Sequence, residues 1–499
     1  MGALAVSSGS IGRMHAVPGL ACPACRGDLR AEGEAKLTCE ACGAGYPILD
    51  GIPSFVPAEA GPRPSRYQLT VLIPASNQAR NLDRLLPALR QELRSLEISH
   101  ELLVVDQGST DGTEETVGRH DARLLRPAMP GYGGALRTGF DQALGEYILT
   151  LDADGSHDPS FLAAIWTARA GVEVVIASRY VDGGGAEMPR ARQALSRTLS
   201  AVLRRGLSLP YSDLSSGYRL YRRAALDALT LHATGFDILQ EILIRMVAAG
   251  YTIREVPLRY RALGTSRAWL ARFAMSHFKT FGAMWKLRNS IASADYDARA
   301  YQSVVPLQRY WQRRRYRVIT TRAAGTRRVL DVGCGSSRII GSTQMVGLDI
   351  VLAKLRYARR YGNPLVHGSI FELPFKDGAF DCVICSEVIE HVPADERVFG
   401  ELERVLEPGG RLILGTPDYD RWRWRALEWL YGRLAPGGYA DEHITHYSRS
   451  NLAAYLAARG FTIDAVEYVG GSEMIFSLRK STGIPAAPPL PVAAGLRSR

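Results

Sequence analysis

The sequence lacks any long uninterrupted apolar stretch. No run reaches the roughly 18 apolar residues at which a membrane-spanning helix becomes the expected interpretation. The start of the chain has neither a basic segment nor a long apolar core, which argues against a secretory signal, and Val6 breaks the N-myristoylation pattern. We therefore expect a cytoplasmic protein without a transmembrane helix. Peripheral contact with the inner face of the cell membrane stays open.

Cysteine is scarce, with seven among 499 residues, and four of them form two CxxC pairs, Cys22/Cys25 and Cys39/Cys42. Zinc takes four thiolates in a tetrahedron, and each CxxC turn supplies two. So small a segment cannot bury a sufficient core, and a metal would supply the missing stability. Two disulfides are the alternative, which a cytoplasmic location disfavours. We predict a zinc site.

Length and composition bound the remaining architecture. A chain of 499 residues is too long for one core, and 46% hydrophobic with 22% charged residues is typical of folded protein. The net charge of +11 indicates anionic partners, namely nucleotide-sugar diphosphates, lipid phosphates, an acidic membrane surface or nucleic acid. Strand-like and helix-like segments alternate in two regions, which predicts two α/β domains with mainly parallel sheets. The expected organisation is a flexible N-terminus (1–20), a zinc ribbon (21–57), a linker (58–66), a first α/β domain (67–290), a basic helical linker (291–325), a second α/β domain (326–480) and a disordered tail (481–499).

Two carboxylates follow a buried strand in the first α/β domain. The segment Tyr147-Ile-Leu-Thr-Leu-Asp-Ala-Asp ends in Asp152 and Asp154, and residues i and i+2 of an extended segment project to the same face. Such a pair suits Mg²⁺ or Mn²⁺, which takes hard oxygen ligands and keeps substrate phosphates in its shell. A polar turn explains Asp-Ala-Asp-Gly equally well, so this pair alone leaves both interpretations open.

Together with Val71-Leu-Ile-Pro-Ala-Ser-Asn and Leu102-Leu-Val-Val-Asp-Gln-Gly, these carboxylates resemble family 2 glycosyltransferases of the GT-A fold, and the match runs from Leu69 to about Tyr260. The resemblance implies a nucleotide-sugar donor. It departs from the family pattern at Gln78, where the family usually has Glu, and at Gln107, where a second Asp is common. The implied site comprises Pro74, Ser76 and Asp106 as donor contacts, with Asp152 and Asp154 as catalytic residues at the diphosphate and metal.

Three further segments, beginning at Ala177, Arg192 and Asp213, resemble the polyprenyl-phosphate mannosyltransferase subgroup. The resemblance implies a polyprenyl-phosphate or related glycolipid acceptor whose phosphate is held by Arg179, Arg192 and Ser196. Arginine suits that role because its planar fork gives bidentate bonds to phosphate oxygens. A solvated basic helix is the alternative. Asp213 either acts as a further acid or orients an arginine, and the aromatic, basic segment 268–291 suits a membrane interface and internal packing equally.

A glycine turn opens the second α/β domain. Arg328-Val-Leu-Asp-Val-Gly-Cys-Gly is a short strand that runs into the turn, and a second strand ends in an acid at Asp349. This arrangement brings backbone close to a ligand while the acid binds a ribose diol. A nicotinamide dinucleotide site is disfavoured because Arg338 stands where the third glycine of GxGxxG would be.

With Phe380-Asp-Cys-Val-Ile-Cys-Ser-Glu-Val-Ile-Glu-His-Val and Leu406-Glu-Pro-Gly-Gly, the stretch from Val329 to about Leu478 resembles class I S-adenosylmethionine methyltransferases. Ser337 and Ser369 depart from the usual glycine and aspartate. Cys382 and Cys385 stand at an odd offset along a strand, which predicts core positions on opposite faces. His391, His443 and His446 are either acceptor-side or structural residues. The implied cofactor contacts are Asp331, Gly333, Gly335, Asp349, Ser369 and Ile370.

The flanks of the four cysteines, from Leu20 and from Tyr46 to Pro57, resemble the small zinc-ribbon proteins that bind and activate methyltransferases. The apolar end of this module, from Ile48 to Val56, needs covering, and we expect it to pack on the methyltransferase-like domain of the same chain.

Three functions follow as hypotheses. The first is a bifunctional enzyme that transfers a sugar to a polyprenyl phosphate and methylates a related glycolipid or glycan. The second keeps the glycosyltransferase but makes the methyltransferase-like domain a silent scaffold for the zinc ribbon. The third is a basic nucleic-acid-binding protein, for which the sequence contains no recognition motif.

Overall fold

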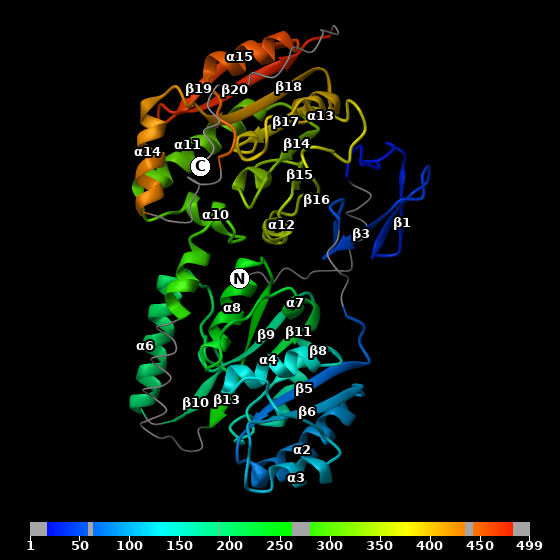
Figure 1. The fold of residues 1–499 in the computed structure, drawn as a ribbon, viewed down its shortest axis with the longest axis vertical. Helices are drawn as coiled ribbons and strands as arrows, with labels where there is room; N and C mark the ends of the chain where they lie inside the picture. The colour runs from blue at the N-terminus through cyan, green and yellow to red at the C-terminus, as the bar shows by residue number, and fades with distance from the viewer. Residues whose placement is uncertain (1–16, 58–62, 189, 262–279, 435–442, 483–499) are drawn as a thin grey trace. The chain divides into compact units, whose positions relative to one another are not determined.

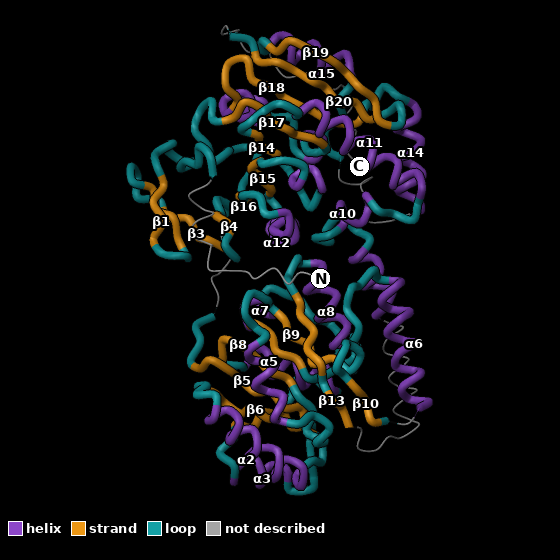
Figure 2. The backbone as a smooth tube through the Cα atoms, turned by 180° about the vertical axis from the view of Figure 1, so that it is seen from behind, coloured by secondary structure: helices purple, strands orange, loops and turns teal. Residues whose placement is uncertain are grey.

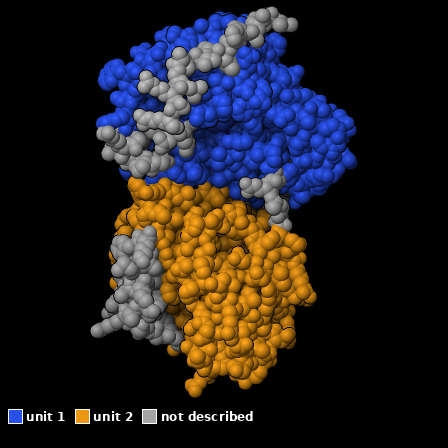
Figure 3. Space-filling model, viewed as in Figure 1, with its two compact units in different colours: residues 1–59, 289–499 blue, residues 60–288 orange. Residues whose placement is uncertain are grey.

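The structure, a computed structural model, describes residues 17–57, 63–188, 190–261, 280–434 and 443–482. Most of the expected flexible N-terminus and disordered tail lies outside these ranges, as do 58–62 of the linker. The chain divides into two compact units, one of residues 60–288 and one of residues 1–59 with 289–499 (Figure 3). No helix among the described residues has both the length and the apolar character that crossing a bilayer requires.

The unit of residues 60–288 is built on a seven-stranded sheet of order β12-β9-β11-β8-β5-β6-β7 (Figure 1). Strand β5 pairs in parallel with β6 and β8, and β11 is antiparallel to β8 and β9. The strands are β5 (Tyr67–Ala75), β6 (His100–Asp106), β7 (Arg123–Leu125), β8 (Gly145–Thr150), β9 (Val174–Ser178), β11 (Arg219–Arg222) and β12 (Ile253–Pro257), with β10 (Gly185–Glu187) and β13 (Arg259–Arg261) as a separate parallel pair.

Helices cover both faces of this sheet. Val71 and Ile73 of β5 join one apolar core with leucines of α2, whereas Leu72 joins the opposite core with α4 and α8. A strand buried on both faces reads as a continuous apolar run, which is the pattern that the sequence presents here. The helices are α2 (Ala79–Ser95), α3 (Thr113–Arg119), α4 (Tyr132–Gln142), η1 (Pro159–Phe161), α5 (Leu162–Thr167), α6 (Arg190–Gly206), α7 (Arg223–Asp227) and α8 (Ile238–Ala248).

The other unit has a second seven-stranded sheet, of order β16-β15-β14-β17-β18-β20-β19. The first five strands are parallel, and β20 is antiparallel to β18 and β19. Cys382 and Cys385 of β17 are both fully buried, in the two different cores of this unit, which confirms the prediction for them. The strands are β14 (Val329–Val332), β15 (Met345–Asp349), β16 (Leu365–His367), β17 (Phe380–Ser386), β18 (Leu406–Pro417), β19 (Phe461–Val469) and β20 (Glu473–Lys480).

Helices again cover both faces of the sheet (Figure 2). Helices α13 and α15 contribute to the core on one face, and α11 and α12 to the other. Helix α11 comes from the segment expected as a linker, yet its Val318 and Ile319 are buried in this core. The helices are α10 (Tyr296–Tyr301), α11 (Pro306–Ala323), η2 (Arg338–Gly341), α12 (Leu352–Ala358), η3 (Arg359–Tyr361), η4 (Ile389–His391), α13 (Glu396–Val405), α14 (Trp422–Leu434) and α15 (Arg449–Ala458).

The cysteine module belongs to the same unit. It forms a four-stranded antiparallel sheet of β1 (Leu29–Glu32), β2 (Lys36–Cys39), β3 (Gly45–Leu49) and β4 (Ile52–Pro53). Tight turns hold the cysteines, since Arg26 N donates to Cys22 O at 2.8 Å and Gly43 N to Cys39 O at 3.0 Å. The two pairs therefore project from two turns at one end of the module.

Candidate functional site

Asp152 and Asp154 lie just beyond β8, at the carboxyl end of the sheet of residues 60–288. Ala153 between them is buried, whereas both aspartates are partly exposed and reach solvent. The Asp152 side chain is 33% exposed. Burial raises its pKa, and the neighbouring Asp154 adds to the rise while His157 opposes it. A cation placed between the two carboxylates would relieve their repulsion.

Two residues that sequence reasoning missed orient Asp152. The Tyr132 hydroxyl donates to Asp152 Oδ1 at 3.0 Å, and the Asp152 backbone N–H donates to His157 Nδ1 at 3.0 Å. Burial lowers the pKa of His157 and favours its neutral form, which that accepted hydrogen bond requires. A Cβ on Gly217 would lie 2.9 Å from the Tyr132 hydroxyl and 3.2 Å from Asp152 Oδ1, so glycine keeps this space open.

The donor-side residues lie on two adjoining loops. Ala75 of β5 pairs with Asp106 of β6, and Asn77 Oδ1 accepts from Thr110 N at 2.9 Å, which ties the loops together. The Asp106 carboxylate accepts from the backbone N–H and the hydroxyl of Ser109. Ser76 is exposed beside it, whereas Pro74 is buried within β5. The structure thus brings Ser76 and Asp106 to one sheet edge and leaves Pro74 beneath the surface.

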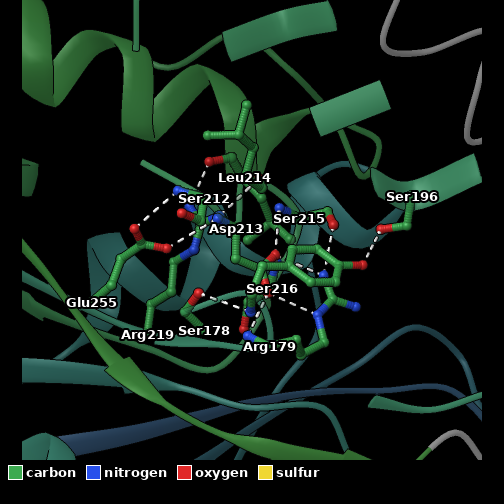
Figure 4. Close-up of polar contacts among 12 residues, drawn as sticks. Ser178, Arg179, Ser196, Ser212, Asp213, Leu214, Ser215, Ser216, Arg219 and Glu255 are labelled. Atoms are coloured by element: carbon green, nitrogen blue, oxygen red, sulfur yellow. Dashed lines mark hydrogen bonds and ion pairs between the residues drawn. The ribbon is translucent and has the colours of Figure 1, made fainter. Parts of the chain in front are cut away.

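Arg179 makes a bidentate pair with Asp213 (Figure 4). Its Nε and Nη2 donate to the two carboxylate oxygens at 2.7 Å each, its backbone N–H donates to Asp213 at 3.0 Å, and Nη2 also reaches Ser215 Oγ at 2.8 Å. Asp213 is fully buried. Burial alone would raise its pKa, but Arg179 lowers it below the ordinary value. Asp213 is therefore ionised and orients Arg179, which favours one of the two roles left open for it.

The other two residues expected at the acceptor phosphate, Arg192 and Ser196, belong to α6. Tyr180 donates from its hydroxyl to Ser196 Oγ of α6 at 2.8 Å, which links Ser196 to the residue after Arg179. The side chain of Arg192 lies outside the described residues. Residues 262–279 of the aromatic, basic segment are likewise outside them. In the described part, Phe281 packs on the core and Trp285 is 45% exposed, so both alternatives for this segment keep support.

A cavity of about 510 Å³ opens at the carboxyl ends of β14, β15 and β16. Glycines with positive φ form the turn after β14, with 70° at Gly333 and 54° at Gly335, and Asp349 accepts from Gly335 N at 2.8 Å. A Cβ on Gly333 would lie 2.2 Å from Val388 Cγ2, so only glycine fits there. The cavity is lined by all six residues expected at the cofactor, namely Asp331, Gly333, Gly335, Asp349, Ser369 and Ile370.

Asp331 has an unusual state within this cavity. It is 4% exposed, and its Oδ2 has no hydrogen-bond partner among the described residues. Burial and the nearby Asp349 raise the pKa of Asp331 to about 8. An uncharged carboxyl that faces a cavity can become ionised when a cationic ligand arrives, which suits a sulfonium-bearing and amine-bearing cofactor.

Two further residues that line this cavity, Asp297 and Lys354, belong to none of the sequence motifs. Asp297 of α10 accepts from the backbone N–H and the hydroxyl of Ser336, both at 3.1 Å, and Lys354 Nζ lies 3.4 Å from the same carboxylate. Asp297 comes from the segment expected as a linker, where no motif marks it.

His391 also lines the cavity, whereas His446 stacks on Tyr419 with ring centroids 3.9 Å apart.

The four thiols of the cysteine module converge. Their Sγ atoms all lie within 4.8 Å of one another, and none is in a disulfide. A Cβ on Gly27 would approach Cys39 Sγ to 3.1 Å and Cys25 Sγ to 3.3 Å, so the turn is packed closely around the thiols. Four soft ligands in such a cluster fit a tetrahedral zinc ion.

The module packs on the methyltransferase-like domain, which confirms the expectation for its apolar end. Ile52 joins the domain core, Phe55 N donates to His367 O at 2.8 Å, and Ser54 Oγ lies 2.8 Å from His367 Nδ1. Ion pairs flank these apolar and backbone contacts. Arg26 Nη2 lies 3.1 Å from Glu401 Oε1, and Asp50 Oδ2 lies 2.7 Å from Arg356 Nε. His367 ends β16, directly before the cavity residues Gly368 and Ser369.

Removing residues 1–60 should therefore lower both the solubility of the protein and its affinity for S-adenosylmethionine, because the deletion exposes the core around Ile52 and frees the end of β16. Light scattering and calorimetric titration of the truncated and complete chains measure the two effects. Unchanged solubility and affinity would show that the module is dispensable to this domain.

Comparison with known proteins gives three separate family matches. Residues 70–230 match the glycosyl transferase family 2, residues 306–466 a methyltransferase domain, and residues 20–51 the Trm112p-like proteins. The polyprenol monophosphomannose synthase of Mycolicibacterium smegmatis is 32% identical over 249 residues, which are 46% of this chain and 91% of that protein. The chain belongs to glycosyl transferase family 2.

Two other similar proteins also match only part of this family 2 chain. The dolichol-phosphate mannosyltransferase of Pyrococcus furiosus is 31% identical over 214 residues, which are 40% of this chain and 59% of that protein. A crystal structure of glucosyl-3-phosphoglycerate synthase from Mycobacterium tuberculosis, in complex with Mn²⁺, UDP-glucose and phosphoglyceric acid, is 22% identical with a TM-score of 0.37, covering 44% of this chain and 80% of that one.

The family assignments made from sequence motifs are thus confirmed, as is the mixed α/β fold class. The family 2 chain is a glycosyltransferase that carries a methyltransferase domain and a Trm112p-like cysteine module.

Proposed function

We propose that this family 2 glycosyltransferase moves a sugar, with inversion, from a nucleotide-sugar donor to a polyprenyl phosphate or related acceptor. The proposal rests on one observation above all: two partly exposed carboxylates, Asp152 and Asp154, follow a strand at the carboxyl end of the sheet, where α/β proteins bind ligands. The resemblance to a polyprenol monophosphomannose synthase supports the acceptor class. A lipid acceptor would bring the protein to the inner membrane surface as a peripheral enzyme.

Asp152 and Asp154 would hold Mg²⁺ or Mn²⁺, for which carboxylate oxygens are fitting ligands. The ion would neutralise charge on the departing nucleoside diphosphate. Tyr132 holds the Asp152 carboxylate, and His157 holds the Asp152 backbone N–H, by the contacts described above. An acceptor phosphate is already anionic, so it needs positioning and charge neutralisation rather than a strong base.

The methyltransferase domain would act on a related glycolipid or glycan with S-adenosylmethionine as cofactor. A silent scaffold is the alternative, motivated by Ser337 and Ser369. In the structure these hydroxyls accept from nearby backbone, Ser337 from Ile339 N and Ser369 from Phe371 N, both at 3.2 Å. Both serines line the cavity, which is open at about 510 Å³ with them in place, and this favours an active domain.

A donor screen tests the glycosyltransferase. Purified protein would be incubated with Mn²⁺, a panel of nucleotide sugars and a short polyprenyl phosphate, and the lipid product would be followed by mass spectrometry. We expect one hexosyl donor to be used, and only with the ion present. Failure of every donor with the polyprenyl phosphate would refute the acceptor class.

Cofactor binding should depend on pH. Because the pKa of Asp331 is about 8 in the free protein, binding of a cationic cofactor ionises Asp331 and releases a proton below that pH. The dissociation constant for S-adenosylmethionine should then fall by up to about tenfold per pH unit as the pH rises towards 8 and level off above it. Calorimetry across roughly pH 6 to 9 measures the slope. Asp331→Asn should remove it, and an equal slope in both proteins would contradict this assignment.

A further inference from the structure

A second group of metal-ligand side chains lies in the methyltransferase domain, apart from the four cysteines. Glu390 and His391 belong to η4, which follows β17, and His443 precedes α15 in the chain. One ligand atom from each of the three lies within 4.8 Å of the others. Residues 52 positions apart in sequence thus converge on one point. 

Glu390 has an unsatisfied buried carboxylate oxygen at this point. It is fully buried, and its Oε2 accepts from the Thr416 hydroxyl at 3.1 Å, while its Oε1 has no hydrogen-bond partner among the described residues. An unsatisfied oxygen on a buried carboxylate is costly, and it requires either a proton or a cation. Imidazole nitrogens such as those of His391 and His443 are ligands suited to sharing a cation with it.

The orientation of His443 agrees with a metal ligand. Its Nδ1 lies 3.2 Å from Glu428 Oε1 and 2.8 Å from the Tyr419 hydroxyl, and Tyr419 in turn donates to Glu428 at 2.7 Å. With Nδ1 facing a carboxylate, Nε2 is the ring nitrogen that we assign as the ligand atom. Metal-bound histidines characteristically have such a carboxylate on the second ring nitrogen, which fixes the ring and makes it a better ligand.

Glu387 adds a further carboxylate near the group, on a strained backbone. Its φ is 60°, a left-handed conformation that a glutamate rarely adopts, and its side chain lines the cavity. Arg315 lies 2.9 Å from its Oε2, whereas Oε1 is buried without a hydrogen bond among the described residues. Strain of this kind concentrates at functional sites.

We propose that Glu390, His391 and His443 form a divalent-metal site at the edge of the methyltransferase cavity, and that its open positions bind a hydroxyl-bearing acceptor. Three mixed nitrogen and oxygen ligands leave coordination positions free, as in catalytic zinc sites, whereas the four thiols of the cysteine module close a structural one. His391 and Glu387 line the same cavity as the six cofactor-side residues. The ligand set suits Zn²⁺ or Mn²⁺.

The acceptor role rests on the proposed methyltransferase activity. A hydroxyl bound to the ion has a lowered pKa and releases its proton to solvent. Its oxygen then forms a bond to the methyl carbon of S-adenosylmethionine as the carbon–sulfur bond breaks, and the sulfonium becomes the neutral thioether of S-adenosylhomocysteine. A hydroxyl on a sugar or glycolipid is an acceptor of the required chemistry.

The test counts metal in the complete chain. Protein loaded with Zn²⁺ and desalted would be measured by inductively coupled plasma mass spectrometry for the wild type, His391→Asn and His443→Gln. We expect each variant to lose one equivalent of zinc while the cysteine module keeps its own. His446→Gln is the matched control, because His446 stacks on Tyr419 outside the group, and it should keep the wild-type count.

Equal zinc in the wild type and in both variants would overturn the site. Circular dichroism establishes that each variant is folded, and Glu390→Gln provides a third, nearly isosteric variant for the same count. The readout does not depend on methylation. Loss of zinc in the variants together with no S-adenosylmethionine binding by the wild type would therefore keep the metal site and refute the proposed methyltransferase function.

Discussion

Asp152→Asn should reduce sugar transfer by at least about 100-fold, the scale of losing one electrostatic contact in a transition state. The reason is that an amide keeps the shape of the side chain but removes the charge that holds the divalent ion. The same reasoning applies to Asp154→Asn. Because Asp152 also accepts from Tyr132, the variant keeps that hydrogen bond and should remain folded. Initial rates at saturating donor measure the effect.

Asp158→Asn is the matched control for these variants. Asp158 is exposed, lies four residues after Asp154 and only caps η1 by accepting from Ser160 N at 2.9 Å. It should retain close to the wild-type rate. A rate loss of the same size in Asp158→Asn, or wild-type rates in both Asp152→Asn and Asp154→Asn, would remove these two carboxylates from the mechanism.

Asp349→Asn should weaken S-adenosylmethionine binding by about 10-fold to 100-fold, which corresponds to losing a charge-assisted hydrogen bond worth roughly 1.5–3 kcal/mol. Asp349 ends β15, lines the cavity and holds the glycine turn through Gly335 N at 2.8 Å. The acid therefore both shapes the turn and offers its charge to a ribose diol. Isothermal titration calorimetry gives the dissociation constant directly.

Asp381→Asn separates the two contributions of Asp349. Asp381 also holds backbone, since it accepts from Arg327 N at 2.8 Å and Arg328 N at 2.9 Å, but it does not line the cavity. It should bind the cofactor with wild-type affinity. Equal weakening in the two variants would attribute the effect to general loosening of the sheet, and no weakening in Asp349→Asn would exclude the ribose contact.

Sequence patterns predicted both sheets and the side chains at their carboxyl ends. The continuous apolar run that ends in Asp106 is characteristic of a strand covered on both faces, so the residues just past it meet those of the neighbouring parallel strands at one edge. The glycine turn was equally predictable, because Gly333 and Gly335 take positive φ that other residues avoid. Local rules of this kind need no knowledge of distant contacts.

Distant contacts account for what the sequence left open. Asp297 reaches the cofactor cavity from a helix expected as linker, and Tyr132 reaches Asp152 from α4 across 20 residues. The role of Asp213 depended on its bond to Arg179, 34 residues away. None of these pairs has a fixed spacing or a composition that marks it. Only the packing of the chain decides which polar side chain a buried carboxylate meets.

The cysteine module shows how an uncovered surface can predict a partner. Its apolar end was too large to face water, and Ile52 and Phe55 are packed against the methyltransferase domain. The sequence did not indicate which edge would receive it. That edge is β16, where Ser54 pairs with His367, and the choice places the module next to the cofactor cavity.

The central claim is that Asp152 and Asp154 hold a divalent ion against the diphosphate of a sugar donor. Electron paramagnetic resonance of Mn²⁺ tests it most directly, by titrating the ion into the wild type and Asp152→Asn with and without a nucleoside diphosphate. Tight Mn²⁺ binding by the wild type that requires the nucleotide and is lost in the variant is the predicted result. Nucleotide-dependent binding that is equal in the two proteins would contradict the claim.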